Sequence, residues 1–185
     1  MLSRNAQEGF QNILKTCALQ SFRCTEGSPK ITLANEITDV KQDQFIMLTI
    51  VSYSFRAILL IHFKFSSDIK DYVKKASFSD ENPDDDACYD YLSELGNEFC
   101  GAIKRELGKH YSHLGMSTPN TLPNTTLNFL SSLDPTYETH SNVFISSDDI
   151  DFGYSLMVSS YEDMDFQAEK PAEEEIEDSG ELEFF

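Results

Sequence analysis

Residues 84–114 read DDDACYDYLSELGNEFCGAIKRELGKHYSHL, the longest stretch of the chain with an unbroken helical period and no proline. Apolar side chains recur in it at steps of three or four residues, which places them on one stripe of a helix with 3.6 residues per turn. They are Cys88, Leu92, Leu95, Phe99, Ile103 and Leu107. The pattern predicts a long amphipathic helix, ended by Gly115, that packs this stripe against a hydrophobic core.

The opposite face of this helix carries Glu94, Asn97 and Gly101, with Asp90 beside them. At about 100° per residue, these positions lie far from the apolar stripe, and residues three apart are neighbours one turn apart. A glycine inside a helix costs roughly 1 kcal/mol relative to alanine. Gly101 lies where core packing does not need it, so it favours close approach of another surface. We therefore interpret this face as a docking surface.

The composition bounds the class of protein. The chain has 185 residues, 40% of them hydrophobic and 25% charged, which is typical of one soluble domain with a short appendage. The formal net charge of -18 argues against nucleic acid or an anionic membrane surface as a partner. No apolar run is long enough to span a bilayer, so we expect no membrane insertion.

The four cysteines indicate the compartment. Cys17, Cys24, Cys88 and Cys100 show no CxxC spacing, and Cys88 lies on the apolar stripe. Reduced thiols in a cytoplasmic protein are the simplest interpretation. We do not expect Cys100 to be a nucleophile, because the neighbouring glutamates Glu94 and Glu98 would raise the pKa of its thiol.

Residues 162–185 differ from the rest of the chain. They contain 11 acidic residues and 1 lysine, a net charge of -10, and show no periodic apolar face. We therefore divide the chain into a domain at 1–161 and an acidic tail at 162–185 that is expected to be disordered. The alternative is a tail that docks through Leu182, Phe184 and Phe185 into a groove.

The remaining elements follow from local patterns. We expect a helix at residues 3–21 capped by Ser3, a short strand at 30–35, and two antiparallel strands within 44–66 that turn near 53–55. A helix at 68–78 precedes a polar turn at 79–86. After the long helix, a loop at 118–139 with a short strand near 127–130 leads to a closing hairpin of 142–147 and 150–161. This order predicts an α+β fold.

The histidines suggest no metal centre. His110 and His113 are three residues apart near the predicted helix end, but no cysteine or carboxylate at ligand spacing completes a site, so capping of the helix is favoured. His62 in a strand and His140 in a loop have no visible partners. The sequence also lacks a glycine-rich phosphate loop and a Gly-x-Ser-x-Gly elbow.

The sequence ELGN at 94–97, followed by Gly101 and Lys104, resembles the E-x-x-N helix of the CheC/CheX/FliY family of chemotaxis phosphatases. Residues 116–119, Met-Ser-Thr-Pro, are similar to the Ser-x-Pro segment that follows this helix in CheX-like members. The resemblance covers roughly residues 3–161. No other glutamate is followed three residues later by asparagine, so the chain resembles the single-site, CheX-like members. Without this context, the two polar side chains would be read as ordinary exposed surface.

The resemblance implies a fold and a function. The fold is an antiparallel β-sheet with long helices packed on one face. The function is that of a phosphatase that hydrolyses the aspartyl phosphate of a CheY-like response-regulator receiver. Asn97 would position the attacking water, Glu94 would anchor a receiver lysine, and the partner-binding surface would include Asp90, Gly101 and Lys104.

The same resemblance sets the expected cofactors and partners. This chain would bind no metal itself, while Mg²⁺ is expected in the phosphorylated partner receiver. A homodimer is implied as well, for which the hairpin strands offer an edge. The alternative from another class is a non-catalytic receiver-binding or adaptor module of the chemotaxis or flagellar system that uses the same helix.

Overall fold

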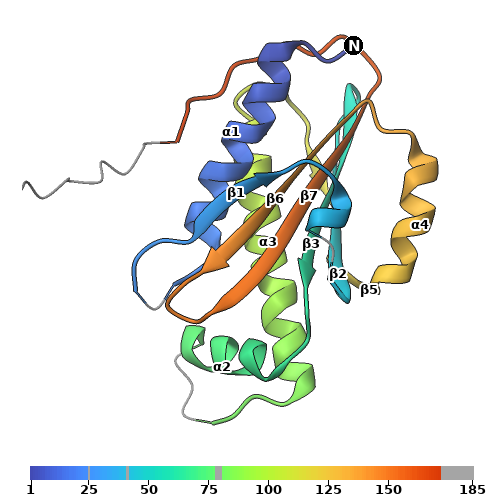
Figure 1. Ribbon diagram of the computed structural model, residues 1–185. Helices are drawn as coiled ribbons and strands as arrows, with labels where there is room; N and C mark the ends of the chain where they lie inside the picture. The colour runs from blue at the N-terminus through green and yellow to red at the C-terminus, as the bar shows by residue number, and fades with distance from the viewer. Residues whose placement is uncertain (25, 41, 78–80, 172–185) are drawn as a thin grey trace, which may run out of the picture.

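An antiparallel sheet runs through the middle of the computed structural model, which describes residues 1–24, 26–40, 42–77 and 81–171 (Figure 1). The strand order is β1-β6-β7-β3-β2-β4, and β5 also pairs with β2. The strands are β1 (Lys30–Ala34), β2 (Gln44–Val51), β3 (Phe55–Phe63), β4 (Gly115–Met116), β5 (Asn120–Pro123), β6 (Tyr137–Ile145) and β7 (Ile150–Ser160). The α-helices are α1 (Arg4–Ser21), α2 (Ser67–Ala76), α3 (Asp85–Leu107) and α4 (Leu127–Leu130), and three short 3-10 turns are η1 (Ile37–Asp39), η2 (Asn124–Thr126) and η3 (Ser131–Leu133).

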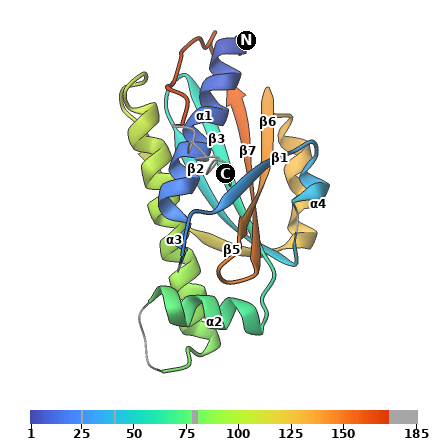
Figure 2. The ribbon, with the colours of Figure 1, turned by 60° about the vertical axis from the view of Figure 1, so that its left-hand side comes forward.

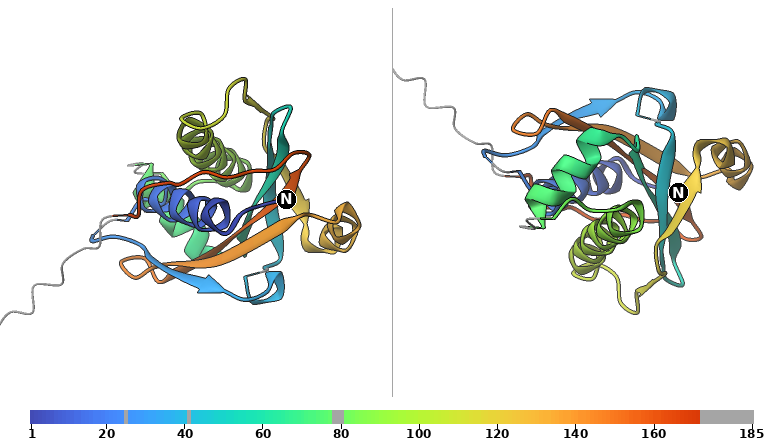
Figure 3. Two further views of the ribbon diagram at one scale, coloured as in Figure 1. Left: turned by 90° about the horizontal axis from the view of Figure 1, so that it is seen from above. Right: turned by 90° about the horizontal axis from the view of Figure 1, so that it is seen from below.

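The long helices α1 and α3 cover one face of this sheet, and α2 lies across one end of it (Figure 3). The predicted class, an α+β fold with an antiparallel sheet and long helices on one face, is confirmed. The short helix α4 lies on the opposite face, as Figure 2 shows. No helix in the described part of the chain is long and apolar enough to cross a membrane.

The central strand β3 is buried on both faces, because its side chains alternate between two hydrophobic clusters. The larger cluster, under the helices, takes Ala57, Leu59, Ile61 and Phe63. The smaller cluster, on the α4 side, consists of Phe45, Ile58, Leu60, Leu130 and Met157. The predicted turn between β2 and β3 is confirmed at residues 52–54, where Ser52 Oγ accepts hydrogen bonds from the backbone N–H groups of Ser54 and Phe55.

Helix α3 forms as its sequence predicts. Asp84 caps its first turn by accepting a hydrogen bond of 2.8 Å from the Ala87 N–H group. All six residues of the apolar stripe are buried. Gly96 brings the helix close to β2, because a Cβ atom at this position would lie 3.2 Å from both Ile46 Cγ2 and Leu48 Cδ1.

The predicted end of this helix is wrong. The helix stops at Leu107 with Gly108 as its C-cap, rather than at Gly115. The N–H groups of His110 and Tyr111 both return to the Leu107 carbonyl, and His113 has a positive φ of 58°, so the chain turns away from the helix axis. Gly115 instead begins β4, which pairs with β2.

The region after α3 departs from the prediction in two more places. The strand expected near residues 127–130 is wrong, since Leu127–Leu130 is the helix α4. Leu127, Leu130 and Leu133 are spaced by three residues, and Leu130 belongs to the smaller cluster while the other two pack against it, which favours helical turns. The closing hairpin is confirmed, although β6 begins at Tyr137, five residues before the expected 142.

Residues 162–171 form a segment that we call the strap, which packs along α1. Leu2 and Met164 form a parallel bridge in which the Ser3 N–H donates to the Met164 carbonyl and the Met164 N–H donates to the Met1 carbonyl, each at 3.0 Å. Met164 and Phe166 are buried. The packed part of the chain therefore extends past the boundary at 161 that the sequence indicated. Of the expected acidic tail, residues 172–185 lie outside the described residues.

Candidate functional site

The face of α3 that turns away from the sheet carries the predicted site. Glu94 and Asp90 are exposed, whereas Asn97 and Gly101 are half-buried. Asn97 Nδ2 donates a hydrogen bond of 3.3 Å to Glu94 Oε2. The helix therefore holds an amide and a carboxylate side by side at its surface.

Gly101, one turn beyond Asn97, opens this surface further. A Cβ atom at Gly101 would meet only the Arg105 side chain, at 3.7 Å from Nη1, which is ordinary van der Waals contact. The fold itself thus has room for a larger residue at this position. Lys104, which belongs to the predicted partner surface with Asp90 and Gly101, is half-buried in the last turn of the helix.

The charges along α3 are separated. Asp85 and Asp86 lie in the first turn, and the basic residues Lys104 and Arg105 lie in the last turn, as the helix dipole favours. Glu98 pairs with Arg23 at 3.3 Å. Within the part of the chain that the structure describes, neither Asp90 nor Glu94 takes part in an ion pair, so both charges remain available to a partner.

The segment at residues 117–119 lies on the edge of β2 beside this helix. The Ser117 N–H donates to the Thr49 carbonyl, and Ser117 Oγ accepts from the Thr49 N–H, both at 2.9 Å. The flanking strands β4 and β5 contact α3. The Ser-x-Pro segment thus extends the sheet next to the helix that carries Glu94 and Asn97.

The Cys100 side chain is fully buried under the helix. Burial raises the pKa of its thiol to about 12, with a small opposing effect from Lys104. The expected direction of the pKa shift holds, but its cause is desolvation and not the neighbouring glutamates. All four cysteines are free.

The histidines considered as metal ligands, His110 and His113, do not form a metal site with other described residues. His110 and His113 lie beyond the end of α3, and the His110 ring contacts that of Phe166 at 4.9 Å between centroids, with the two planes tilted by 38°. In the described residues, no group of three or more His, Cys, Asp or Glu side chains is arranged to hold a metal ion.

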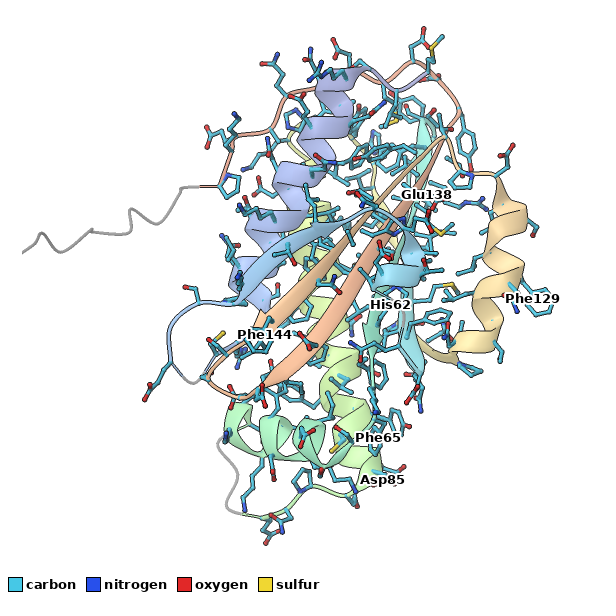
Figure 4. All side chains as sticks on the ribbon, in the orientation of Figure 1. His62, Phe65, Asp85, Phe129, Glu138 and Phe144 are labelled. Atoms are coloured by element: carbon cyan, nitrogen blue, oxygen red, sulfur yellow. The ribbon has the colours of Figure 1, made fainter. Side chains whose placement is uncertain are left out.

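A buried polar network that was not predicted from the sequence lies on the α4 side of the sheet. His62 Nε2 lies 3.0 Å from Ser155 Oγ, and the same oxygen lies 2.9 Å from His140 Nδ1. His140 Nε2 continues to Glu138 at 3.4 Å. His140 therefore stands in strand β6 and not in a loop, and both histidines have partners. Figure 4 labels His62 and Glu138, the two ends of this network.

One signal for this network was present in the sequence. His62 interrupts a strand whose other residues predict burial on both faces, and a buried polar side chain requires a partner. Burial, together with the nearby His140, lowers the pKa of His62 to about 4. Burial also lowers the pKa of His140, although Glu138 opposes this shift. Both imidazoles are therefore neutral at pH 7.

Comparison with known proteins identifies the fold. No protein-family model and no curated protein matches the sequence. A chain of the CheX–CheY–BeF₃–Mg²⁺ complex from Borrelia burgdorferi superposes with a TM-score of 0.61 at 10% identity, over 83% of this chain and 97% of that chain. A CheC-like superfamily protein from Shewanella sp. PV-4 superposes with a TM-score of 0.59 at 16% identity, over 82% of this chain and 98% of that chain.

A third structure has the same architecture. The FliM middle domain from Vibrio alginolyticus superposes with a TM-score of 0.52 at 8% identity, over 83% of this chain and 92% of that chain. The sheet and its helical layer thus define a class of α+β proteins. Within this class, the chain has the fold of CheC-like and CheX chemotaxis proteins.

Proposed function

We propose that this protein is a phosphatase that hydrolyses the aspartyl phosphate of a CheY-like receiver. One observation carries the proposal: Asn97 and Glu94 lie side by side on the open face of α3, in a chain that has the CheX fold. The likeness to a CheX–CheY complex supports a receiver as the partner. Gly101 and the unpaired charge of Glu94 are the features expected of a surface onto which another protein docks closely.

The proposed mechanism places Asn97 in the active site of the receiver. Phosphoryl transfer proceeds through a loose transition state, so the main catalytic task is to hold a water molecule in line with the phosphorus. An amide side chain does this by hydrogen bonding and needs no change of protonation. Glu94 contacts a receiver lysine and fixes the helix in register, with Asp90 and Lys104 at the rim. The receiver supplies the Mg²⁺ ion.

Release of phosphate from a panel of phosphorylated CheY-like receivers tests this proposal. We expect the wild-type protein to accelerate release, and Asn97→Ala to lose about a hundredfold of the acceleration because the water is no longer held in line. Asn5→Ala, which removes an exposed amide from α1, is the matched control and should retain full activity. Full activity of Asn97→Ala would exclude the mechanism.

The second candidate is a non-catalytic module that binds a receiver. The FliM middle domain has the same fold, so the fold itself is compatible with this candidate. This candidate predicts that the protein binds phosphorylated receivers without accelerating phosphate release, and that Asn97→Ala binds as well as the wild type. Measuring binding and turnover on the same receiver distinguishes the two candidates.

A further inference from the structure

We infer that Glu94 is a positioning residue for Asn97, and that it turns the carbonyl oxygen Oδ1 of Asn97 toward the attacking water. This inference rests on the proposed function and specifies which atom of the Asn97 amide contacts the water. It adds a second task to the anchoring of the partner by Glu94. The observation behind it is the hydrogen bond of 3.3 Å from Asn97 Nδ2 to Glu94 Oε2.

The chemistry of the two groups decides which way the amide points. An ionised carboxylate only accepts hydrogen bonds, whereas an amide has one donating end and one accepting end. The reversed amide would place Asn97 Oδ1 against Glu94 Oε2, so that two acceptors face each other without a proton between them. The NH₂ group therefore faces Glu94.

Nothing else on the helix surface competes for the amide. In the described residues, the hydrogen bond to Glu94 is the only one that the Asn97 side chain makes. One turn further along, Gly101 has no side chain that could reach it. Asn97 Oδ1 is thus left to accept a hydrogen bond from outside the protein.

An accepting oxygen suits the proposed reaction. The water oxygen must direct a lone pair at the phosphorus, and a hydrogen bond from water O–H to Asn97 Oδ1 leaves that lone pair free. As the new O–P bond forms, the bond from phosphorus to the aspartyl oxygen breaks, and the carboxylate leaves with the electron pair. Both protons of the water stay with the phosphate, which departs as H₂PO₄⁻. A donating NH₂ group would instead occupy one of the two lone pairs of the water oxygen and make that oxygen a weaker nucleophile.

The two tasks of Glu94 use different properties of its side chain. Anchoring a receiver lysine needs negative charge, whereas orienting Asn97 needs an acceptor oxygen beside its NH₂ group. Glu94→Gln removes the charge and keeps an oxygen that can accept from Asn97 Nδ2, while its own NH₂ group also admits the reversed amide, so the wild-type orientation of Asn97 is kept in part. Glu94→Ala removes both the charge and the oxygen. Because Glu94 is exposed, both variants should fold.

Steady-state kinetics with a phosphorylated receiver separate the two tasks. We expect Glu94→Gln to raise KM about tenfold and to keep kcat within about twofold of wild type, as loss of uniform binding predicts. Glu94→Ala should raise KM by a similar factor and also lower kcat about tenfold, because the amide of Asn97 then rotates freely. A kcat for Glu94→Ala equal to that of wild type overturns the inference while leaving the phosphatase function intact. A wild type that accelerates no receiver overturns the proposed function, and the inference with it.

NMR of the free protein supplies a readout that does not depend on turnover. The two side-chain amide protons of Asn97 should separate more in wild type and Glu94→Gln than in Glu94→Ala, because one of them is hydrogen-bonded to residue 94 only in the first two proteins. Coinciding resonances in wild type and Glu94→Ala would contradict the inference directly.

Discussion

Gly96 and Gly101 lie on opposite faces of α3 and have different roles. A Cβ atom at Gly96 would press against Ile46 and Leu48 at 3.2 Å, whereas at Gly101 it would meet only a flexible arginine at 3.7 Å. Gly96 thus serves the packing of the helix on the sheet. The packing of the fold does not require a glycine at position 101, so Gly101 points to close approach by a partner protein.

Gly101→Ala should therefore change stability and activity in opposite directions. Alanine favours the helix by about 1 kcal/mol and fits the available space, so the free energy of unfolding in urea should rise. The added methyl group holds the receiver away from the helix backbone, and KM for the phosphorylated receiver should rise about tenfold, or about 1.4 kcal/mol of binding. A variant that binds its receiver as well as wild type would show that no partner approaches Gly101.

Gly96→Leu is the counterpart on the buried face. The larger side chain must push α3 away from β2, and overpacking of this kind costs about 2 kcal/mol. Urea denaturation should show this loss. An unchanged free energy of unfolding would mean that the helix can shift on the sheet without penalty.

At the scale of elements, sequence periodicity was most informative where one element buries one face. The stripe of α3 and the positions of Glu94 and Asn97 followed from helical geometry alone, because residues on one helix share a single frame. The end of α3 and the type of α4 did not follow. Residues 127–130 contain Leu and Phe, which suit strands as well as helices, and only packing against β2, β3 and β7 decides between them.

The strap is an element that local patterns did not reveal, because its stability comes from distant contacts. The Phe166 ring packs edge-on against Phe10 at 5.1 Å and Tyr111 at 5.6 Å, over the surface that Gly9 leaves open. These partners are far away in sequence. Composition alone therefore grouped the strap with the acidic residues that follow it.

Phe166→Ala should destabilise the protein by about 3 kcal/mol, the cost of removing a buried aromatic ring. Thermal and urea unfolding measure this loss. Gln167→Ala, at the neighbouring exposed position, is the control and should change stability by less than about 0.5 kcal/mol. Equal stability of the two variants would mean that the strap contributes nothing to the domain.

For the whole molecule, the buried network of His62, Ser155 and His140 links stability to pH. Its members come from three strands, and His62 is 93 residues from Ser155. The network could therefore be predicted only if the pairing of these strands were already known. No pattern within one strand identifies such partners. The network also explains how two neutral histidines are accommodated inside the sheet.

Stability should fall as the pH drops from about 6.5 toward about 4. The pKa of His62 is lowered to about 4 from its ordinary value of 6.5. Between these two pH values, His62 is therefore protonated in the unfolded chain but neutral in the folded protein. The contribution of His62 is fully present above pH 6.5, and roughly 3 kcal/mol of it is lost by pH 4. Urea denaturation at a series of pH values measures this slope.

His62→Phe isolates this effect from the carboxylates that titrate in the same range. The His62 ring already lies beside an aromatic ring, with its centroid 5.9 Å from that of Phe45, and a phenylalanine there takes up no proton. The difference in unfolding free energy between wild type and variant should therefore change between pH 6.5 and pH 4. A difference that stays constant would show that His62 is protonated equally in both states.

The bridge between Leu2 and Met164 pairs the first residues with the strap. The amino group of Met1 lies 2.6 Å from Asp163 Oδ1, and a peptide that joins residue 171 to residue 1 would close the chain into a ring while keeping the buried side chains of Met164 and Phe166 in place. The position at which such a ring is opened then determines the order of the elements along the chain. A circular permutant opened at the turn of residues 52–54 should fold to the same sheet and present α3 unchanged, which would make this site transferable to fusion proteins with a new pair of ends.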